Sequence, residues 1–131
     1  MMTDPISDLL TQIKNAYMAE KKTIEVSHSN MQESLVKLLS REGYLGKIEI
    51  NKKDKVKKTI SVEMVYEDKK PRLTEIVRVS KPSKKVYISK NEIPRVLGGL
   101  GIVVISSPAG LISGREARKK GIGGELICKI W

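Results

Sequence analysis

Apolar residues recur at helical spacing in two segments of the first half of the chain. Asp4 and Pro5 are suited to cap and to start the first helix. Asn30 is placed to cap the second, with Glu33 at capping-box spacing and Gly43 where a left-handed residue would end it. The two apolar stripes comprise Ile6, Leu9, Leu10, Ile13 and Tyr17, and then Leu35, Val36, Leu38 and Leu39. This pattern predicts two amphipathic helices.

Short apolar and β-branched runs between and after these helices predict strands at residues 23–26, 44–50 and 59–66. The lysine-rich residues 51–55 between the last two runs indicate an exposed hairpin loop. We therefore expect an α-β-α-β-β unit over residues 1–66, followed by a linker at residues 67–72.

The second half changes character after the linker. Further strands are predicted at residues 73–79, 85–88, 102–105 and 125–131, with a turn at 81–84 between the first two. Residues 91–97 have the pattern of a short helix, and Ser113, Glu116 and Gly121 are spaced to cap and end another. The expected fold class is α+β in two small domains, the second (73–131) being a mostly antiparallel β domain with short helices.

Composition narrows the class of protein. The chain has 131 residues and is 40% hydrophobic, which indicates a globular protein with a core of its own. The longest mostly apolar run, residues 96–105, is interrupted by glycines and is too short to cross a bilayer. The first residues lack the basic start and apolar stretch of a signal peptide. We expect a cytoplasmic protein without a membrane partner.

The charge is unevenly distributed along the chain. Residues 1–68 hold 11 Lys and Arg against 11 Asp and Glu, whereas residues 69–131 hold 14 against 4. The second half therefore carries the whole net charge of +10. A basic excess confined to one half is typical of a protein that binds a polyanion, although a basic surface that serves only solubility is the alternative.

The sequence offers little for catalysis. The single histidine, His28, lies in a polar connection and is expected to be an ordinary solvated residue. The single cysteine, Cys128, alternates with apolar neighbours and is expected in the core. The two glycine clusters, residues 98–101 and 121–124, match neither a Walker loop nor a dinucleotide fingerprint. We predict no enzyme activity, no metal, no cofactor and no small-molecule substrate.

Candidate RNA-binding residues gather in the second half. Tyr87 would stack on a base or sugar, although composition alone favours a half-buried strand tyrosine. Residues 106–110 follow a predicted strand, and their two serine hydroxyls would hydrogen-bond RNA. The alternative is that this segment is a plain turn. Long cationic side chains that suit phosphates form two clusters, namely Lys81, Lys84, Lys85, Lys90 and Arg95, and then Arg115, Arg118, Lys119 and Lys120.

Several separated segments together resemble a known family. They are residues 4–16, 86–88, 93–97, 101–112, 115–118 and 123–128. In this order they resemble bacterial ribosomal protein eight of the small (30S) subunit, and the resemblance covers the whole chain. It implies two associated domains and direct binding to a helical stem in the central domain of small-subunit rRNA, in support of platform assembly. It also implies contacts with neighbouring small-subunit ribosomal proteins and, in some bacteria, repression of the protein's own operon mRNA through a similar stem.

The resemblance places RNA contacts in a loop usually written Ser-Thr-Ser-Lys-Gly and in the nearby Gly-Gly-Glu turn. Here the loop is residues 106–110, in which Pro108 and Ala109 depart from the family pattern and remove a hydroxyl, an amide donor and a cation. Glu125 would accept a hydrogen bond from RNA, or would hold the loop through its amides. The predicted RNA-binding residues are Lys85, Tyr87, Ser106, Ser107, Gly110, Arg115, Arg118, Lys119, Gly123, Gly124 and Glu125.

Overall fold

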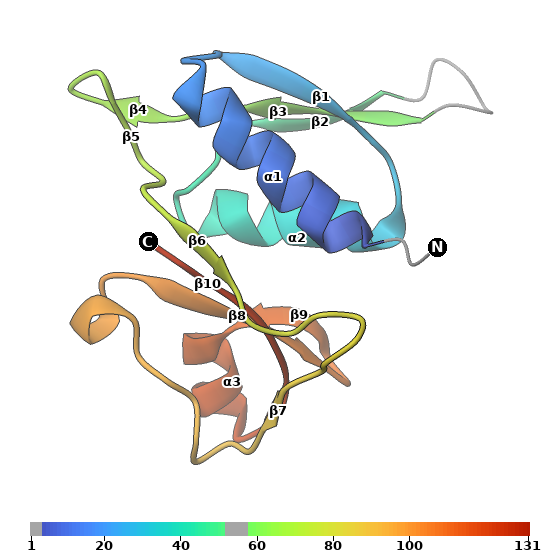
Figure 1. Ribbon diagram of the computed structural model, residues 1–131, viewed down its shortest axis with the longest axis vertical. Helices are drawn as coiled ribbons and strands as arrows, with labels where there is room; N and C mark the ends of the chain where they lie inside the picture. The colour runs from blue at the N-terminus through green and yellow to red at the C-terminus, as the bar shows by residue number, and fades with distance from the viewer. Residues whose placement is uncertain (1–3, 52–57) are drawn as a thin grey trace. The chain divides into compact units, whose positions relative to one another are not determined.

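The computed structural model describes residues 4–51 and 58–131 and is shown in Figure 1. The chain divides into two compact units. The N-terminal unit comprises Pro5–Leu73, and the C-terminal unit comprises Thr74–Trp131 together with Asp4. Helices and antiparallel sheets occur together, so the predicted α+β class is confirmed. In the described residues, no helix is long and apolar enough to cross a membrane.

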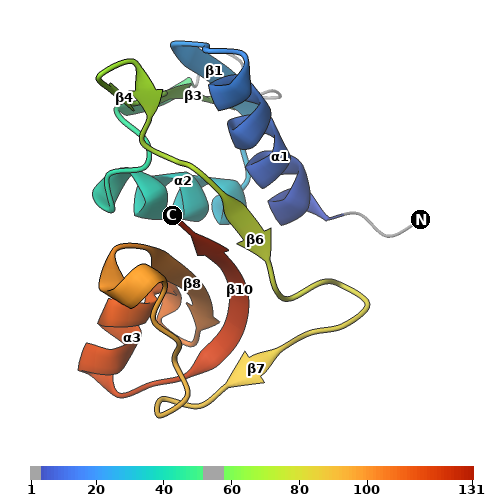
Figure 2. The ribbon, with the colours of Figure 1, turned by 60° about the vertical axis from the view of Figure 1, so that its left-hand side comes forward.

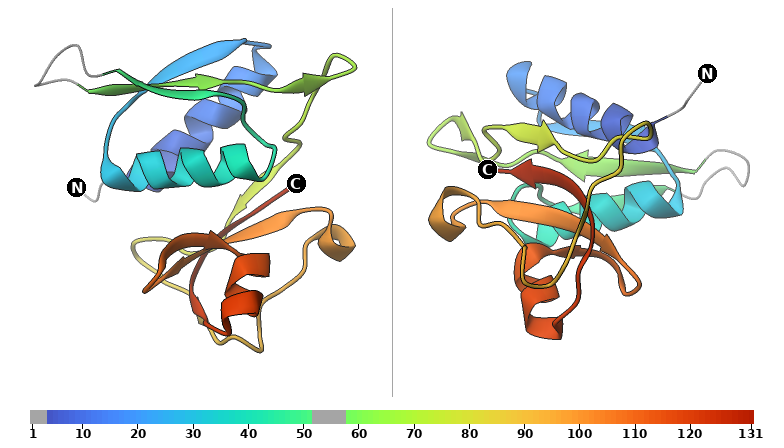
Figure 3. Two further views of the ribbon diagram at one scale, coloured as in Figure 1. Left: turned by 180° about the vertical axis from the view of Figure 1, so that it is seen from behind. Right: turned by 60° about the horizontal axis from the view of Figure 1, so that its bottom comes forward.

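The N-terminal unit places two helices on one face of a three-stranded sheet. Its elements are α1 (Pro5–Met18), β1 (Thr23–Ser27), α2 (Asn30–Arg41), β2 (Ile48–Asn51) and β3 (Thr59–Glu63). The strands are antiparallel in the order β1-β3-β2, and both helices lie on the same side of them (Figure 3). The predicted α-β-α-β-β order is confirmed. The predicted loop at residues 51–55 falls mostly on residues 52–57, which lie outside the described residues.

Both predicted apolar stripes form the core of this unit. The buried residues of α1 are Leu9, Leu10, Ile13, Ala16 and Tyr17, and those of α2 include Leu35, Val36, Leu38 and Leu39. Val26, Ile60 and Val62 of the sheet are also buried, whereas Thr59, Ser61 and Glu63 alternate with them on the outer face. The strands follow the ordinary alternation of a sheet that is covered on one side only.

The start of α2 differs from the prediction by one residue. Ser29, not Asn30, caps the helix, because its Oγ accepts a hydrogen bond from the backbone N–H of Gln32 at 3.1 Å. Glu33 does not close a capping box. Its carboxylate lies 2.8 Å from His28 Nε2 and 2.9 Å from Lys37 Nζ, and these two partners lower the pKa of Glu33. The prediction of an ordinary solvated histidine was therefore wrong, since the side chain of His28 is only 16% exposed.

Two strands are shorter than predicted, because backbone N–H groups at their predicted ends donate to partners outside the sheet. Gly43 has φ 87° after α2, and the N–H of Tyr44 still donates to the Leu39 carbonyl at 2.9 Å. β2 therefore begins at Ile48 rather than at residue 44. β3 ends at Glu63, and the N–H of Val65 donates to the Tyr17 hydroxyl at 3.0 Å.

The residues expected to act as a linker, 67–72, contain most of a short hairpin. Its strands are β4 (Tyr66–Glu67) and β5 (Lys70–Pro71), and they pair antiparallel. Arg72 Nη1 lies 2.8 Å from the Glu67 carboxylate across this hairpin. The division between the two units follows at Leu73.

The C-terminal unit is a curved antiparallel sheet with one short helix (Figure 2). Its elements are β6 (Ile76–Arg78), β7 (Tyr87–Ile88), the 3-10 turn η1 (Leu97–Gly99), β8 (Ile102–Ser107), β9 (Gly110–Ser113), α3 (Gly114–Lys120) and β10 (Gly124–Ile130). The strand order is β6-β10-β8-β9, and β7 also pairs with β10. α3 begins and ends as predicted, because Ser113 Oγ accepts from the Glu116 N–H and Gly121 is left-handed.

One prediction for this unit was wrong, and one of its strands was not predicted. Residues 91–97 do not form a helix, since Val96 is extended and only the 3-10 turn Leu97–Gly99 follows it. Pro94 explains the difference, because proline disfavours the helical conformation of the residue before it. Residues 110–113 form strand β9, which was missed because the Ser106–Gly110 segment was interpreted only as a turn ahead of a helix cap.

Cys128 is fully buried on β10, as predicted, and burial raises the pKa of its thiol to about 12. The thiol therefore stays neutral and unreactive at ordinary pH. Cys128→Ala should lower the free energy of unfolding by about 1 kcal/mol through a small cavity. The RNA affinity that the sequence predicts should be unchanged in the folded variant. Urea unfolding and RNA titration of the same preparation check this. A stable variant without RNA affinity would contradict the assignment of Cys128 to the core.

Candidate nucleic-acid interface

Four residues of the C-terminal unit lie in one row across its sheet. Glu125 of β10 is in register with Tyr87 of β7 and with Ser106 of β8, and Ser106 is in register with Leu111 of β9. Residues opposite one another on paired strands share a face of the sheet. We call Tyr87, Glu125, Ser106 and Leu111 the cross-strand row. It brings together three of the predicted RNA-binding residues.

The other face of the same strands forms the apolar core of the unit. Ile105, Ile112 and Leu126 alternate with the row and cluster with Ala117 of α3. The row is not covered in this way: Ser106, Leu111 and Glu125 are partly exposed, and Tyr87 is 67% exposed. The expectation of a half-buried strand tyrosine was therefore wrong. The ring of Tyr87 is available for stacking.

Gly123 and Gly124 bring the backbones of three strands close together. A Cβ on Gly124 would lie 2.2 Å from the carbonyl oxygen of Ser106, and a Cβ on Gly123 would lie 2.2 Å from that of Ile88. Both contacts are with backbone atoms, which cannot turn aside as a side chain can. The lack of a side chain at these glycines therefore allows β10 to lie between β7 and β8. It also sets the distance between neighbouring residues of the cross-strand row.

Glu125 holds a different loop from the one expected. Its carboxylate accepts a short hydrogen bond from the hydroxyl of Ser80, and that hydroxyl accepts the N–H of Val86 at 3.1 Å. Ser80 is fully buried, so this chain of bonds closes the base of the loop at residues 81–85. The alternative in which Glu125 accepts amides of the Ser106–Gly110 loop is not found. Sequence reasoning missed Ser80, and no motif or spacing marks it.

The loop at residues 106–110 is the tip of the β8–β9 hairpin. The hydroxyl of Ser107 donates to the Gly110 carbonyl at 3.0 Å and accepts the Ala109 N–H at 3.1 Å. Gly110 has φ 101°, a conformation that favours glycine, and Pro108 is exposed at the tip. Pro108 and Ala109, the two residues that depart from the family pattern, therefore lie in a tight turn. In this turn the Ser107 hydroxyl already has two hydrogen-bond partners.

The predicted cations separate into two groups. Lys81, Lys84 and Lys85 are exposed on the loop that leads into β7, beside the cross-strand row. Arg115, Arg118 and Lys119 are exposed on α3, which packs against the opposite face of the sheet. Arg118 Nη1 also donates to the Ile93 carbonyl at 3.5 Å. The structure therefore does not place the α3 cations on the same face as the row.

The described residues supply no alternative chemistry at this surface. No group of three or more His, Cys, Asp or Glu side chains among them is arranged to hold a metal ion. Across residues 4–51 and 58–131, none of the ion pairs involves Lys81, Lys84, Lys85, Arg115 or Lys119. These cations remain available to a polyanion.

Known proteins resemble this chain along its whole length. Residues 4–131 match the family described as Ribosomal protein S8. A relative from Dictyoglomus turgidum, named small ribosomal subunit protein uS8, is 47% identical over 130 residues, which cover 99% of this chain and 98% of the relative. Relatives with the same name from Mycoplasmopsis synoviae and Clostridium novyi are 44% and 43% identical over similar spans. The match covers nearly the full length of the chain and of these relatives, and the chain belongs to the ribosomal protein S8 family.

Proposed function

We propose that this protein binds a helical stem in the central domain of small-subunit rRNA directly and supports assembly of the platform. Membership of the family makes it a structural, non-enzymatic component of the small ribosomal subunit, associated with ribosomes in the cytoplasm. One observation carries the RNA-binding proposal. The cross-strand row is partly exposed, with Tyr87 accessible, beside lysines that form no ion pair with the described residues, in the half of the chain that holds the whole net charge.

The row suits an irregular RNA stem. A-form RNA presents 2′-hydroxyls and base edges in a shallow minor groove, and proteins read sequence from bases that are splayed out. Tyr87 would stack on such a base or on a sugar. Ser106 would exchange hydrogen bonds with a 2′-hydroxyl, and the Glu125 carboxylate has acceptor capacity beyond the bond from Ser80. The Tyr87 ring, the Ser106 hydroxyl and the Glu125 carboxylate, held in place by the sheet, would therefore recognise the stem.

The cations would supply sequence-independent affinity. A lysine that neutralises a phosphate releases a condensed counterion, and each such contact adds about 0.7–0.9 to the dependence of log affinity on log salt. Lys85 lies two positions before Tyr87 and is the nearest cation to the row along the chain. The cations of α3 would contact a second segment of the RNA, since they lie against the opposite face of the sheet.

Lys85→Ala and Lys119→Ala should each lower the salt slope of RNA binding by up to about one unit. The loss of affinity at fixed salt should be modest, because each exposed lysine contributes one screened contact. Titrations of the stem RNA at several salt concentrations measure both quantities. Lys22→Ala, in the neutral N-terminal unit, is the matched control and should leave the slope unchanged. An equal decrease for Lys22→Ala would contradict the assignment of RNA binding to the C-terminal unit.

Ser107→Ala should weaken stem binding by roughly 1–3 kcal/mol without changing the salt slope, since a hydroxyl is lost and no charge is removed. Part of this loss would come through the turn, because the Ser107 hydroxyl joins the Ala109 N–H to the Gly110 carbonyl. Ser107→Thr keeps the hydroxyl and is the conservative control. A change of slope with unchanged affinity at fixed salt would refute the role of the hydroxyl.

Binding of a similar stem in the protein's own operon mRNA would use the same surface. The two RNAs should then compete for one site, and Tyr87→Ala should weaken both. The neutral N-terminal unit would instead contact neighbouring proteins of the subunit, because it offers little excess charge to RNA.

A further inference from the structure

We infer that Ser80 is a positioning residue for RNA recognition, because its buried hydroxyl holds both the Glu125 carboxylate and the backbone beside Tyr87 in the arrangement that the RNA meets. This inference rests on the proposed binding of an RNA stem and deepens it by naming the group that orders the recognition surface. Ser80 itself would not touch the RNA, since it is fully buried.

The chain leaves the sheet of the C-terminal unit between β6 and β7. β6 ends at Arg78 and β7 begins at Tyr87, and both strands pair with β10. The partners of these two residues, Cys128 and Glu125, lie close together along β10, so residues 79–86 form a loop outside the sheet (Figure 2). This loop carries the exposed lysines beside the cross-strand row, so whatever holds its base also places these cations.

Backbone bonds and one side chain together close the base of the loop. The N–H groups of Val79 and Ser80 both donate to the Ile127 carbonyl, at 3.0 and 3.3 Å, and the Leu126 N–H donates to the Val86 carbonyl at 2.9 Å. The Val86 N–H donates to the Ser80 hydroxyl at 3.1 Å. The serine side chain therefore takes the place of a backbone acceptor at this point of the sheet.

The direction of the two bonds fixes the carboxylate of Glu125. A serine hydroxyl has a single proton. Because the Val86 N–H donates to Ser80 Oγ, that proton is directed to Glu125, to which the hydroxyl donates a short hydrogen bond. Hydrogen bonds to a charged acceptor are stronger than those between neutral groups. The bond holds the Oε2 atom of Glu125 and leaves the other oxygen as a fixed acceptor for a 2′-hydroxyl or a base amino group.

Packing alone does not explain a serine at this position. Burial removes water from a hydroxyl, and this costs free energy unless the fold supplies hydrogen-bond partners. Both partners of the Ser80 hydroxyl belong to the candidate interface, since Glu125 is in the cross-strand row and Val86 directly precedes Tyr87. One hydroxyl therefore joins the side of the row that would stack to the side that would hydrogen-bond.

The first test titrates the full-length chain and its Ser80→Ala variant with a helical stem from the central domain of small-subunit rRNA. Ser80→Ala should weaken binding by about tenfold, because neither the carboxylate nor the base of the loop is then held. In amide hydrogen exchange by NMR, the Val86 N–H should exchange about tenfold faster or more, while the amides of β8 stay slow. Cys128→Ala, in the same sheet but outside this chain of bonds, is the matched control and should lose stability without losing RNA affinity.

A double-mutant cycle distinguishes positioning from a general loss of stability. In the Glu125→Ala background, Ser80→Ala should weaken binding only about threefold or less, because the carboxylate that the hydroxyl holds is already absent. In the Lys119→Ala background it should keep its full effect, since the two residues share no partner. Equal effects in the two backgrounds would overturn the inference, because a loss of stability alone acts in both.

Ser80→Cys keeps the test decisive if the alanine variant does not fold. The thiol fills the buried position but is a weak donor and a weak acceptor, so both bonds are weakened. This variant should bind the stem several-fold more weakly than the wild type. Wild-type affinity in Ser80→Cys, or in a folded Ser80→Ala variant, would refute the positioning role.

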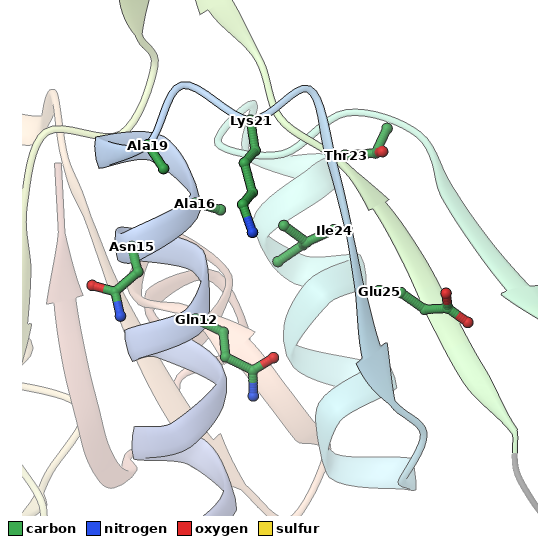
Figure 4. A pocket seen from close by; sticks show the side chains of 8 residues that line it. All are labelled: Gln12, Asn15, Ala16, Ala19, Lys21, Thr23, Ile24 and Glu25. Carbon is green, nitrogen blue, oxygen red and sulfur yellow. The ribbon is translucent and has the colours of Figure 1, made fainter.

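A groove in the N-terminal unit supplies a cation control. It lies between α1 and β1, has a volume of about 480 Å³ and is open to solvent, and Figure 4 shows the side chain of Lys21 lying in it. Lys21→Ala should leave stem affinity and the effect of Ser80→Ala unchanged. A loss of affinity in Lys21→Ala as large as that in Ser80→Ala would assign the RNA to this groove and contradict both proposals.

The same titrations separate failure of this inference from failure of the proposed function. If Tyr87→Ala and Glu125→Ala weaken binding and the Ser80 variants do not, the RNA surface is correct and the role of Ser80 is wrong. If none of these variants weakens binding, the RNA surface itself is wrong.

Discussion

Gly124→Ala is expected to prevent the C-terminal unit from folding stably. The new Cβ would lie 2.2 Å from the carbonyl oxygen of Ser106, a backbone atom of β8, at the start of β10 where this strand is paired with β7 and, from Glu125 on, with β8. Relief requires β10 to move away from β8, which breaks the register that aligns Glu125 with Ser106. We expect a loss of about 3 kcal/mol or more in the free energy of unfolding, the range of severe overpacking.

Chemical denaturation monitored by the single tryptophan, Trp131, measures this loss, because Trp131 packs against the core of the same unit. Gly121→Ala is the matched control. A Cβ there meets no neighbouring atom within 4 Å, but the residue has φ 66°, so only the smaller cost of a left-handed alanine is expected. Equal losses for the two variants would show that backbone conformation, rather than close approach of the strands, explains the glycines of this turn.

Tyr87→Ala should weaken binding of the stem RNA by about 1–3 kcal/mol, the usual contribution of a base stacked on an aromatic side chain. The ring is 67% exposed in the free protein, so its removal should cost little stability. The salt slope should not change, because no charge is lost. Titration at a fixed salt concentration and at two others measures the affinity and the slope together.

Tyr87→Phe is the conservative control and should retain most of the affinity, since stacking needs the ring and not the hydroxyl. If Tyr87→Phe lost as much affinity as Tyr87→Ala, the hydroxyl would be the contact and the stacking role would be wrong. Unchanged affinity in both variants would remove Tyr87 from the interface.

The sequence was sufficient where a local pattern determines the structure. The stripes of α1 and α2, the capping of α3 by Ser113 and the core position of Cys128 depend on spacing along the chain, and each was predicted. One failure comes from a partner distant in sequence, because the Tyr17 hydroxyl accepts the Val65 N–H and β3 ends early. Others are local: Pro94 disfavours a helix at residues 91–97, and β9 pairs with β8 in a hairpin that was interpreted only as a turn.

The candidate site shows the same limit. Charge and resemblance indicated the C-terminal half and most of the residues in it. The sheet then determined which residues share a face: Tyr87, Glu125 and Ser106 come together, and the α3 cations do not join them. Ser80 was missed because its role depends on a hydroxyl shared between Glu125 and Val86, residues that are close only in the folded sheet.

The most direct test of the account is a map of the residues that the RNA touches. Backbone amide shifts of the full-length chain would be recorded by NMR as a helical stem from the central domain of small-subunit rRNA is added. The account predicts large changes at Tyr87, Ser106 and Glu125 and along residues 81–85 and 107–110, with few in Pro5–Leu73. Changes concentrated in Pro5–Leu73, with the cross-strand row unaffected, would contradict it.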